Sequence, residues 1–147
     1  MRKLLYIATL LTTLTSCTKD EITYSSQRTV YDALAQWEAD AMAHNVDLGD
    51  LNITIEFYPF EEEAHHISGR AIYGIPVIHI NSNRWKGSDQ NIATVYHEIG
   101  HVFGLRHGDH PIITALTNAS SARDGMREKD SYFALIKNAV YYEQLTQ

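Results

Sequence analysis

Residues 97–107 are the stretch on which the interpretation of this 147-residue chain is built, and they read His97-Glu98-Ile99-Gly100-His101-Val102-Phe103-Gly104-Leu105-Arg106-His107. His97 and His101 are four residues apart, so on a helix their rings lie on one face, one turn apart. Gly104 permits the positive φ with which a helix ends sharply, and the turn would return His107 towards the other two rings. Three imidazoles placed in this way can hold one zinc ion and leave its fourth position open to solvent, as catalytic zinc sites do.

Glu98 supplies the base that a hydrolytic site of this kind needs. It projects from the edge of the histidine face and can reach a water molecule without binding the metal itself. Because zinc lowers the pKa of bound water to about 7, we expect Glu98 to take the proton as water attacks a peptide carbonyl. The five fixed positions would arise by chance on the order of once in 10⁴ such chains. The stretch therefore predicts a zinc metallopeptidase with one catalytic ion, and endopeptidase activity is what this site and the family resemblance described next imply together.

The motif resembles that of the metzincin metallopeptidases, which continues to a methionine-containing turn beneath the zinc. Met126 matches that methionine, because Met1 and Met42 both precede the motif. Some families in the group have a tyrosine two residues after the methionine, and here Glu128 stands in its place. The resemblance therefore implies the Met-turn but leaves any help from that tyrosine in doubt.

A second implication of the resemblance concerns substrate binding. In metzincins the edge strand just before the catalytic helix binds an extended peptide by strand addition. The resemblance thus places four residues along the cleft, namely Val77, Ile78, His79 and Ile80.

The remaining sequence predicts a single small α/β (α+β) domain with a twisted mixed β-sheet, an active-site helix, a packing helix and a C-terminal helix. Ser88 is a good helix N-cap, whereas Gly74 and Pro76 limit their stretch to an edge strand or two short pieces. The expected elements are a helix over 28–44, strands over 51–58 and 71–81, the active-site helix over 89–103, an irregular segment over 108–127, and a last helix over 130–145 with Phe133, Ile136 and Val140 facing the core.

The N-terminus has the features of a bacterial lipoprotein signal. A basic start precedes an apolar run over residues 4–14 that is too short to span a bilayer, and Leu14-Thr15-Ser16-Cys17 resembles a lipoprotein box. Cys17 is the only cysteine, so the chain can form no internal disulfide. We therefore expect a signal peptide over 1–16, a lipidated Cys17 with a tether over 17–26, and a zinc metallopeptidase domain over 27–147.

Composition narrows the partners further. A net charge of −6 argues against a nucleic-acid role, because phosphate binding needs a basic face. The expected partners are a protein or peptide substrate and a lipid anchor that holds a monomer to the outer membrane or cell surface of a bacterium. Two alternatives remain open: a non-catalytic zinc-binding surface lipoprotein that acts as an adhesin or binding module, and a metallo-amidase that acts on cell-wall peptides.

Several other residues have two readings each. Asp109 and His110 could orient a ligand imidazole or could be solvated loop residues. Two further groups could supply a second, structural zinc site and an oxyanion donor, although the spacing of the histidines is not a recognised ligand set and aromatic packing is preferred for the tyrosines. Their members are His65, His66 and His79 for the zinc site, and Tyr132, Tyr141 and Tyr142 for the donor.

Overall fold

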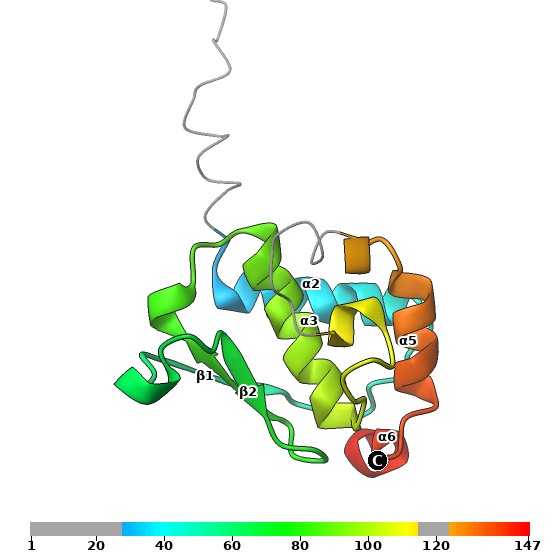
Figure 1. Cartoon of the computed structure of the whole chain (residues 1–147). Coiled ribbons are helices and arrows are strands. Elements are labelled where there is room, and N and C mark those ends of the chain that lie inside the picture. Colours follow the sequence, from blue (N-terminus) through cyan, green and yellow to red (C-terminus); the bar gives the residue numbers. More distant parts are fainter. Residues whose placement is uncertain (1–27, 115–123) are drawn as a thin grey trace, which may run out of the picture.

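The computed structural model describes residues 28–114 and 124–147. The predicted signal peptide, Cys17 and the whole tether lie outside these ranges. Within them, no helix combines the length and apolar content needed to cross a membrane. Figure 1 shows a three-stranded sheet on one side of the central helix α3 (Asp89–Phe103) and helix α5 (Lys129–Lys137) on the other. The predicted small α/β domain is confirmed.

Helix α2 (Val30–Ala43) begins at a capping box. The Thr29 hydroxyl accepts a hydrogen bond from the Asp32 backbone N–H (3.1 Å), and the Asp32 carboxylate accepts one from the Thr29 N–H (2.8 Å). These bonds satisfy two of the donors that a helix start leaves unpaired. One face of α2 is buried against α3 and the sheet; its buried residues are Val30, Ala33, Trp37 and Ala41.

The sheet has the strand order β1-β3-β2, so β3 (Val77–Asn81) is its central strand. Strand β1 (Thr54–Tyr58) pairs with β3 in parallel, and β2 (Gly69–Ala71) pairs with it antiparallel. The expectation that residues 77–80 form an edge strand is therefore wrong. Strand β3 is longer than β2 and carries the fully buried Ile78 and Ile80, so the central position, with both backbone edges paired, suits it better than an edge. The edge strands of the sheet are β1 and β2.

Helix α3 has the bounds that the sequence predicts. The Ser88 side chain caps its first turn by accepting from the Asn91 N–H (3.4 Å), and Gly104 ends it with φ of +103°. Most of its residues are buried, because α3 packs against the sheet, α2 and the segment after His110. A helix that is enclosed in this way fixes the positions of the histidines it carries.

The C-terminal region differs from the single helix expected over 130–145. Helix α5 ends at Lys137, and a separate short helix, α6 (Tyr142–Thr146), follows. Val140, expected in the core, is 83% exposed. The break lets the Tyr141 backbone N–H donate to the Phe103 carbonyl (3.3 Å) and sets the Tyr141 ring beside Gly104. These contacts with the end of α3 stabilise the chain more than the backbone hydrogen bonds of one continuous helix would.

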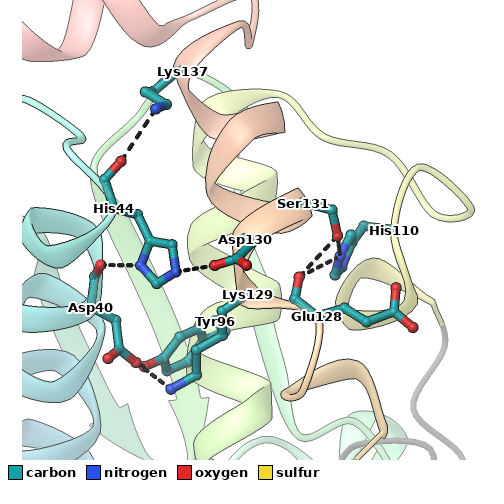
Figure 2. Close-up of polar contacts among 9 residues, drawn as sticks. All are labelled: Asp40, His44, Tyr96, His110, Glu128, Lys129, Asp130, Ser131 and Lys137. Carbon is teal, nitrogen blue, oxygen red and sulfur yellow. Dashed lines mark hydrogen bonds and ion pairs between the residues drawn. The ribbon is translucent and has the colours of Figure 1, made fainter.

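Polar contacts attach α5 to α2 and α3 (Figure 2). His44 Nε2 lies 2.8 Å from the Asp130 carboxylate, and Lys129 pairs with Asp40. The Tyr96 hydroxyl donates to the same Asp40 carboxylate (2.6 Å). Burial raises the pKa of Asp40, but the hydrogen bonds from Lys129 and Tyr96 outweigh it and hold that pKa below its ordinary value. The ionised Asp40 on α2 thus connects this helix to Tyr96 on α3 and to Lys129 on α5.

Replacing Tyr132 with Phe is expected to destabilise the fold by about 1–3 kcal/mol. The buried Tyr132 hydroxyl accepts from the Trp37 indole N–H (3.1 Å) and donates to the Tyr96 carbonyl (2.7 Å). The change therefore leaves the buried Trp37 N–H without a partner and removes the side-chain bond to the Tyr96 carbonyl, which keeps its bond within α3. Urea unfolding followed by circular dichroism measures the effect. Tyr31→Phe removes a hydroxyl from a side chain that is 63% exposed and serves as the matched control. Equal stability of the two variants would contradict the prediction.

Candidate metal centre

Three histidine side chains converge at the C-terminal end of α3. The Nε2 atoms of His97 and His101 are 3.0 Å apart, those of His97 and His107 are 3.2 Å apart, and those of His101 and His107 are 3.1 Å apart. Helix α3 supplies the first two, and the turn at Gly104 returns the third, as the sequence predicted. Among the described residues this is the group whose ligand atoms lie close enough together to hold a metal ion.

The outer nitrogens of two rings are held by the backbone. His97 Nδ1 lies 2.8 Å from the Ile112 carbonyl oxygen, and His101 Nδ1 lies 2.7 Å from the Leu105 carbonyl oxygen. A carbonyl can only accept, so in each ring Nδ1 carries the proton and Nε2 presents its lone pair. The two ligand atoms are therefore in the tautomer that metal binding requires.

The spacing of the three Nε2 atoms fits a metal ion better than it fits mutual hydrogen bonding. In His97 and His101 the proton is on Nδ1, so their Nε2 lone pairs face each other with no hydrogen between them. Zinc–nitrogen bonds of about 2.0–2.1 Å at tetrahedral angles would separate two ligand nitrogens by about 3.3–3.4 Å. The observed 3.0–3.2 Å separations are close to that value. The three histidines can hold one metal ion.

Burial sets the charge of these groups. It lowers the pKa of His97 to about 4, and it also lowers the pKa of His101, so both rings are neutral at neutral pH. Burial raises the pKa of the Glu98 carboxyl to about 8. A cation nearby would favour the carboxylate form. The site therefore offers neutral imidazoles to a metal ion and gives Glu98 a pKa in the range where proton transfer is useful.

Glu98 is buried beneath the edge strand of the sheet. A Cβ atom added to Gly69 in β2 would come within 2.7 Å of Glu98 Oε1 and 2.8 Å of Glu98 Cγ. Only glycine allows the backbone of β2 to approach the carboxyl group this closely. Gly69 is a neighbour of the candidate site that sequence reasoning missed, because nothing in the sequence shows that β2 lies against residue 98.

We expect Gly69→Ala to destabilise the fold by about 1–3 kcal/mol, since either β2 or the Glu98 side chain must move. Urea unfolding measures this cost. In the Glu98→Ala background the space under β2 is open, so the same Gly69→Ala change should cost much less there. An equal cost in both backgrounds would show that the contact with Glu98 is not the cause.

The three histidines and Glu98 open into a cleft of about 1200 Å³. Its wall is formed largely by the residues of and around β2, from Ser68 to Tyr73, and by α3. Of the four residues expected along the cleft, His79 lines it, whereas Val77, Ile78 and Ile80 do not. The reason is that β2 lies between β3 and the cleft. Tyr58 and Tyr73 also line the cleft, and the Tyr73 ring stands 5.8 Å from the His101 ring.

The segment after His107 supports the site from the side of α5. His110 is buried: its Nδ1 accepts from the Ile112 N–H (3.0 Å), and its Nε2 lies 2.9 Å from the Ser131 hydroxyl and 3.1 Å from the Glu128 carbonyl (Figure 2). His110 thereby holds the backbone N–H of Ile112, the residue whose carbonyl oxygen contacts His97. Of the two roles expected for His110, orientation of a candidate ligand is the one that this geometry supports. His110 acts on His97 through Ile112 and not by direct contact.

Met126 lies in the same region. It is partly buried and packs against the core, and its neighbour Gly125 abuts the backbone of Pro111 and Ile112. The turn that carries Met126 therefore adjoins the segment that binds His97. The assignment of Met126 as the Met-turn residue stays a prediction.

Other candidates have structural roles in the described chain. Asp109 accepts from the Arg106 backbone N–H (2.6 Å) and shapes the turn. Tyr132 is a core residue, and neither Tyr141 nor Tyr142 lines the cleft. No second group of ligand atoms is found among the described residues, and His65, His66 and His79 do not form one.

No protein-family model, curated protein or solved structure matches this chain. The interpretation of the site therefore rests on its own geometry and chemistry.

Proposed function

We propose that this chain is a zinc-dependent endopeptidase that hydrolyses proteins or peptides outside the cytoplasm. The observation that carries the proposal is the triangle of His97, His101 and His107 Nε2 atoms, which shares an open cleft with Glu98. Neutral imidazoles are preferred ligands of zinc, and three protein ligands with one open position are typical of catalytic zinc. A binding module would have no need of a buried carboxyl group at this place.

In the proposed reaction, the zinc ion and the side chains of the protein have separate roles. Zinc, when bound, lowers the pKa of a coordinated water and polarises the scissile carbonyl. His97 and His101 are held in the ligating tautomer by the Ile112 and Leu105 carbonyls. Glu98 accepts a proton from the attacking water on a carboxylate oxygen and returns it to the nitrogen of the leaving amine. Burial raises the pKa of Glu98 and the zinc charge would lower it, so the two effects act in opposite directions on the base.

The free edge of β2 is the natural place for an extended peptide. Strand β2 borders the cleft, and its outer edge has no strand partner among the described residues. The resemblance to metzincins supports strand addition there, with β2 in place of the residues 77–80 first expected. The lipoprotein box that ends at Cys17 supports a monomer anchored by lipid at the outer membrane or cell surface.

The test is metal analysis of the purified full chain combined with digestion of a mixed peptide library. We expect one zinc ion per chain, and we expect cleavage that a chelator abolishes and added zinc restores. A chain without stoichiometric zinc, or a zinc-loaded chain that cleaves no peptide, would overturn the proposal. Parallel digestion of peptidoglycan fragments identifies a metallo-amidase if those fragments alone are cleaved.

A further inference from the structure

The cleft that contains the three histidines is rich in positive charge. Three arginines line it, Arg70 on β2, Arg84 after β3, and Arg106 next to His107. Of the lining residues that the structure describes, Glu98 is the only acidic one. The cleft is thus basic in a chain whose net charge is −6.

The distribution of charge over the described residues shows that the contrast is local. These ranges contain eight Lys and Arg residues and sixteen Asp and Glu residues. Three of the eight cationic residues line the cleft, whereas one of the sixteen acidic residues does. A uniform surface with this composition would place more acids than bases in the cleft. The cleft is the place where a negatively charged ligand is attracted to an otherwise acidic molecule.

None of the three guanidinium groups is neutralised by a carboxylate among residues 28–114 and 124–147. Arg84 Nε donates to the Ser68 hydroxyl (3.1 Å), and the Arg70 guanidinium lies over the Phe60 ring, 4.8 Å from its centroid. These contacts orient the side chains and leave guanidinium N–H groups for a ligand. Arginine binds carboxylates through two parallel hydrogen bonds, which suits Asp and Glu side chains.

The position of two arginines connects the charge to the reacting centre. Arg84 contacts Ser68, the residue before Gly69, and Gly69 lies against Glu98. Arg106 precedes the metal-ligand candidate His107. A peptide whose scissile bond lies at Glu98 and the histidines would therefore pass both guanidinium groups within a few residues.

We propose that the cleft selects acidic peptides, with Asp or Glu side chains close to the scissile bond. The proposal rests on the proposed peptidase function and names its substrate class. An exposed ion pair changes an affinity by roughly two- to five-fold, and several pairs in one cleft combine. We expect a peptide with glutamates on both sides of the scissile bond to have kcat/KM at least about 10-fold above its glutamine counterpart. The lysine counterpart should be worse than both.

The kinetic test uses quenched fluorescent peptides that share one cleavable core from the library digest and differ only in flanking Glu, Gln or Lys. Arg70→Gln, Arg84→Gln and Arg106→Gln should each lower the Glu-to-Gln ratio of kcat/KM by about two- to five-fold, and 0.5 M NaCl should lower it too. Lys86→Gln makes the same change in net charge outside this cleft and should leave the ratio unchanged. A ratio near one for the wild-type chain would overturn the proposal.

A binding test separates this proposal from the peptidase function. The zinc-loaded Glu98→Gln chain is titrated with the same peptides labelled for fluorescence anisotropy, so no turnover is needed. Tighter binding of the Glu peptide, weakened in the three arginine variants, supports acidic selection even if no peptide is cleaved by the wild type. Cleavage by the wild type with equal binding and equal rates for all three peptides would overturn acidic selection and leave the peptidase proposal standing.

Discussion

Replacing Glu98 with Gln is expected to lower kcat/KM for peptide cleavage by roughly 10²–10⁴-fold, the usual contribution of a general base. The amide has the shape of the carboxyl group but cannot take a proton from water. The three histidines are untouched, so the zinc content should stay at one ion per chain. Because burial disfavours the charged form of Glu98, the neutral replacement should not destabilise the fold.

Progress curves on a peptide from the library digest, together with metal analysis and thermal unfolding of the same samples, check this expectation. Glu143→Gln, an exposed acid on α6, is the matched control and should behave as the wild type. A Glu98→Gln chain that keeps full activity would rule out Glu98 as the base. A chain that loses its zinc would instead show that Glu98 takes part in metal binding.

Replacing His107 with Ala is expected to weaken zinc binding by more than about 100-fold. Loss of a group that merely orients a ligand costs about 10–100-fold in affinity, and His107 contributes a ligand atom itself. It is the exposed member of the three, so its removal should cost the fold less than removal of the buried His97. Peptide cleavage should fall with the loss of metal.

Zinc affinity is measured by competition with a chromogenic chelator, and bound zinc should raise the unfolding temperature of the wild type but not of the variant. His65→Ala removes an exposed imidazole that is not part of the three-histidine group and should leave the affinity unchanged. An unchanged affinity in His107→Ala would remove His107 from the ligand set and leave a two-histidine site.

Local chemistry explains why much of the site could be predicted. The Ser88 cap, the i and i+4 histidines and the Gly104 stop all act within one helix and its turn, so their outcome depends on neighbours in sequence. The helix bounds 89–103 and the convergence of His107 with the other two follow from those neighbours. The spacing also singled out Glu98, which lines the same cleft.

The failures all involve partners that are distant in sequence. The strand order depends on the pairing of β1 with β3, which are separated in sequence by β2, and this pairing leaves β2 on the other edge of β3, next to the cleft. The last helix breaks because Tyr141 finds partners at Phe103 and Gly104. Gly69 and the arginines of the cleft belong to no sequence motif. Their positions near Glu98 and the histidines are set only by the path of the backbone in the folded chain.

The sequence by itself determined the helix that carries His97 and His101, its end, and the residue types that meet there, because helix periodicity and capping are set by residues within a few positions of one another. Only the tertiary structure decided which strand borders the cleft, what lies over Glu98, and how positive the cleft is. Those properties depend on the strand order of the sheet. The strand order is fixed by the burial of apolar side chains such as Ile78 and Ile80, and this burial is complete only when the whole core is assembled.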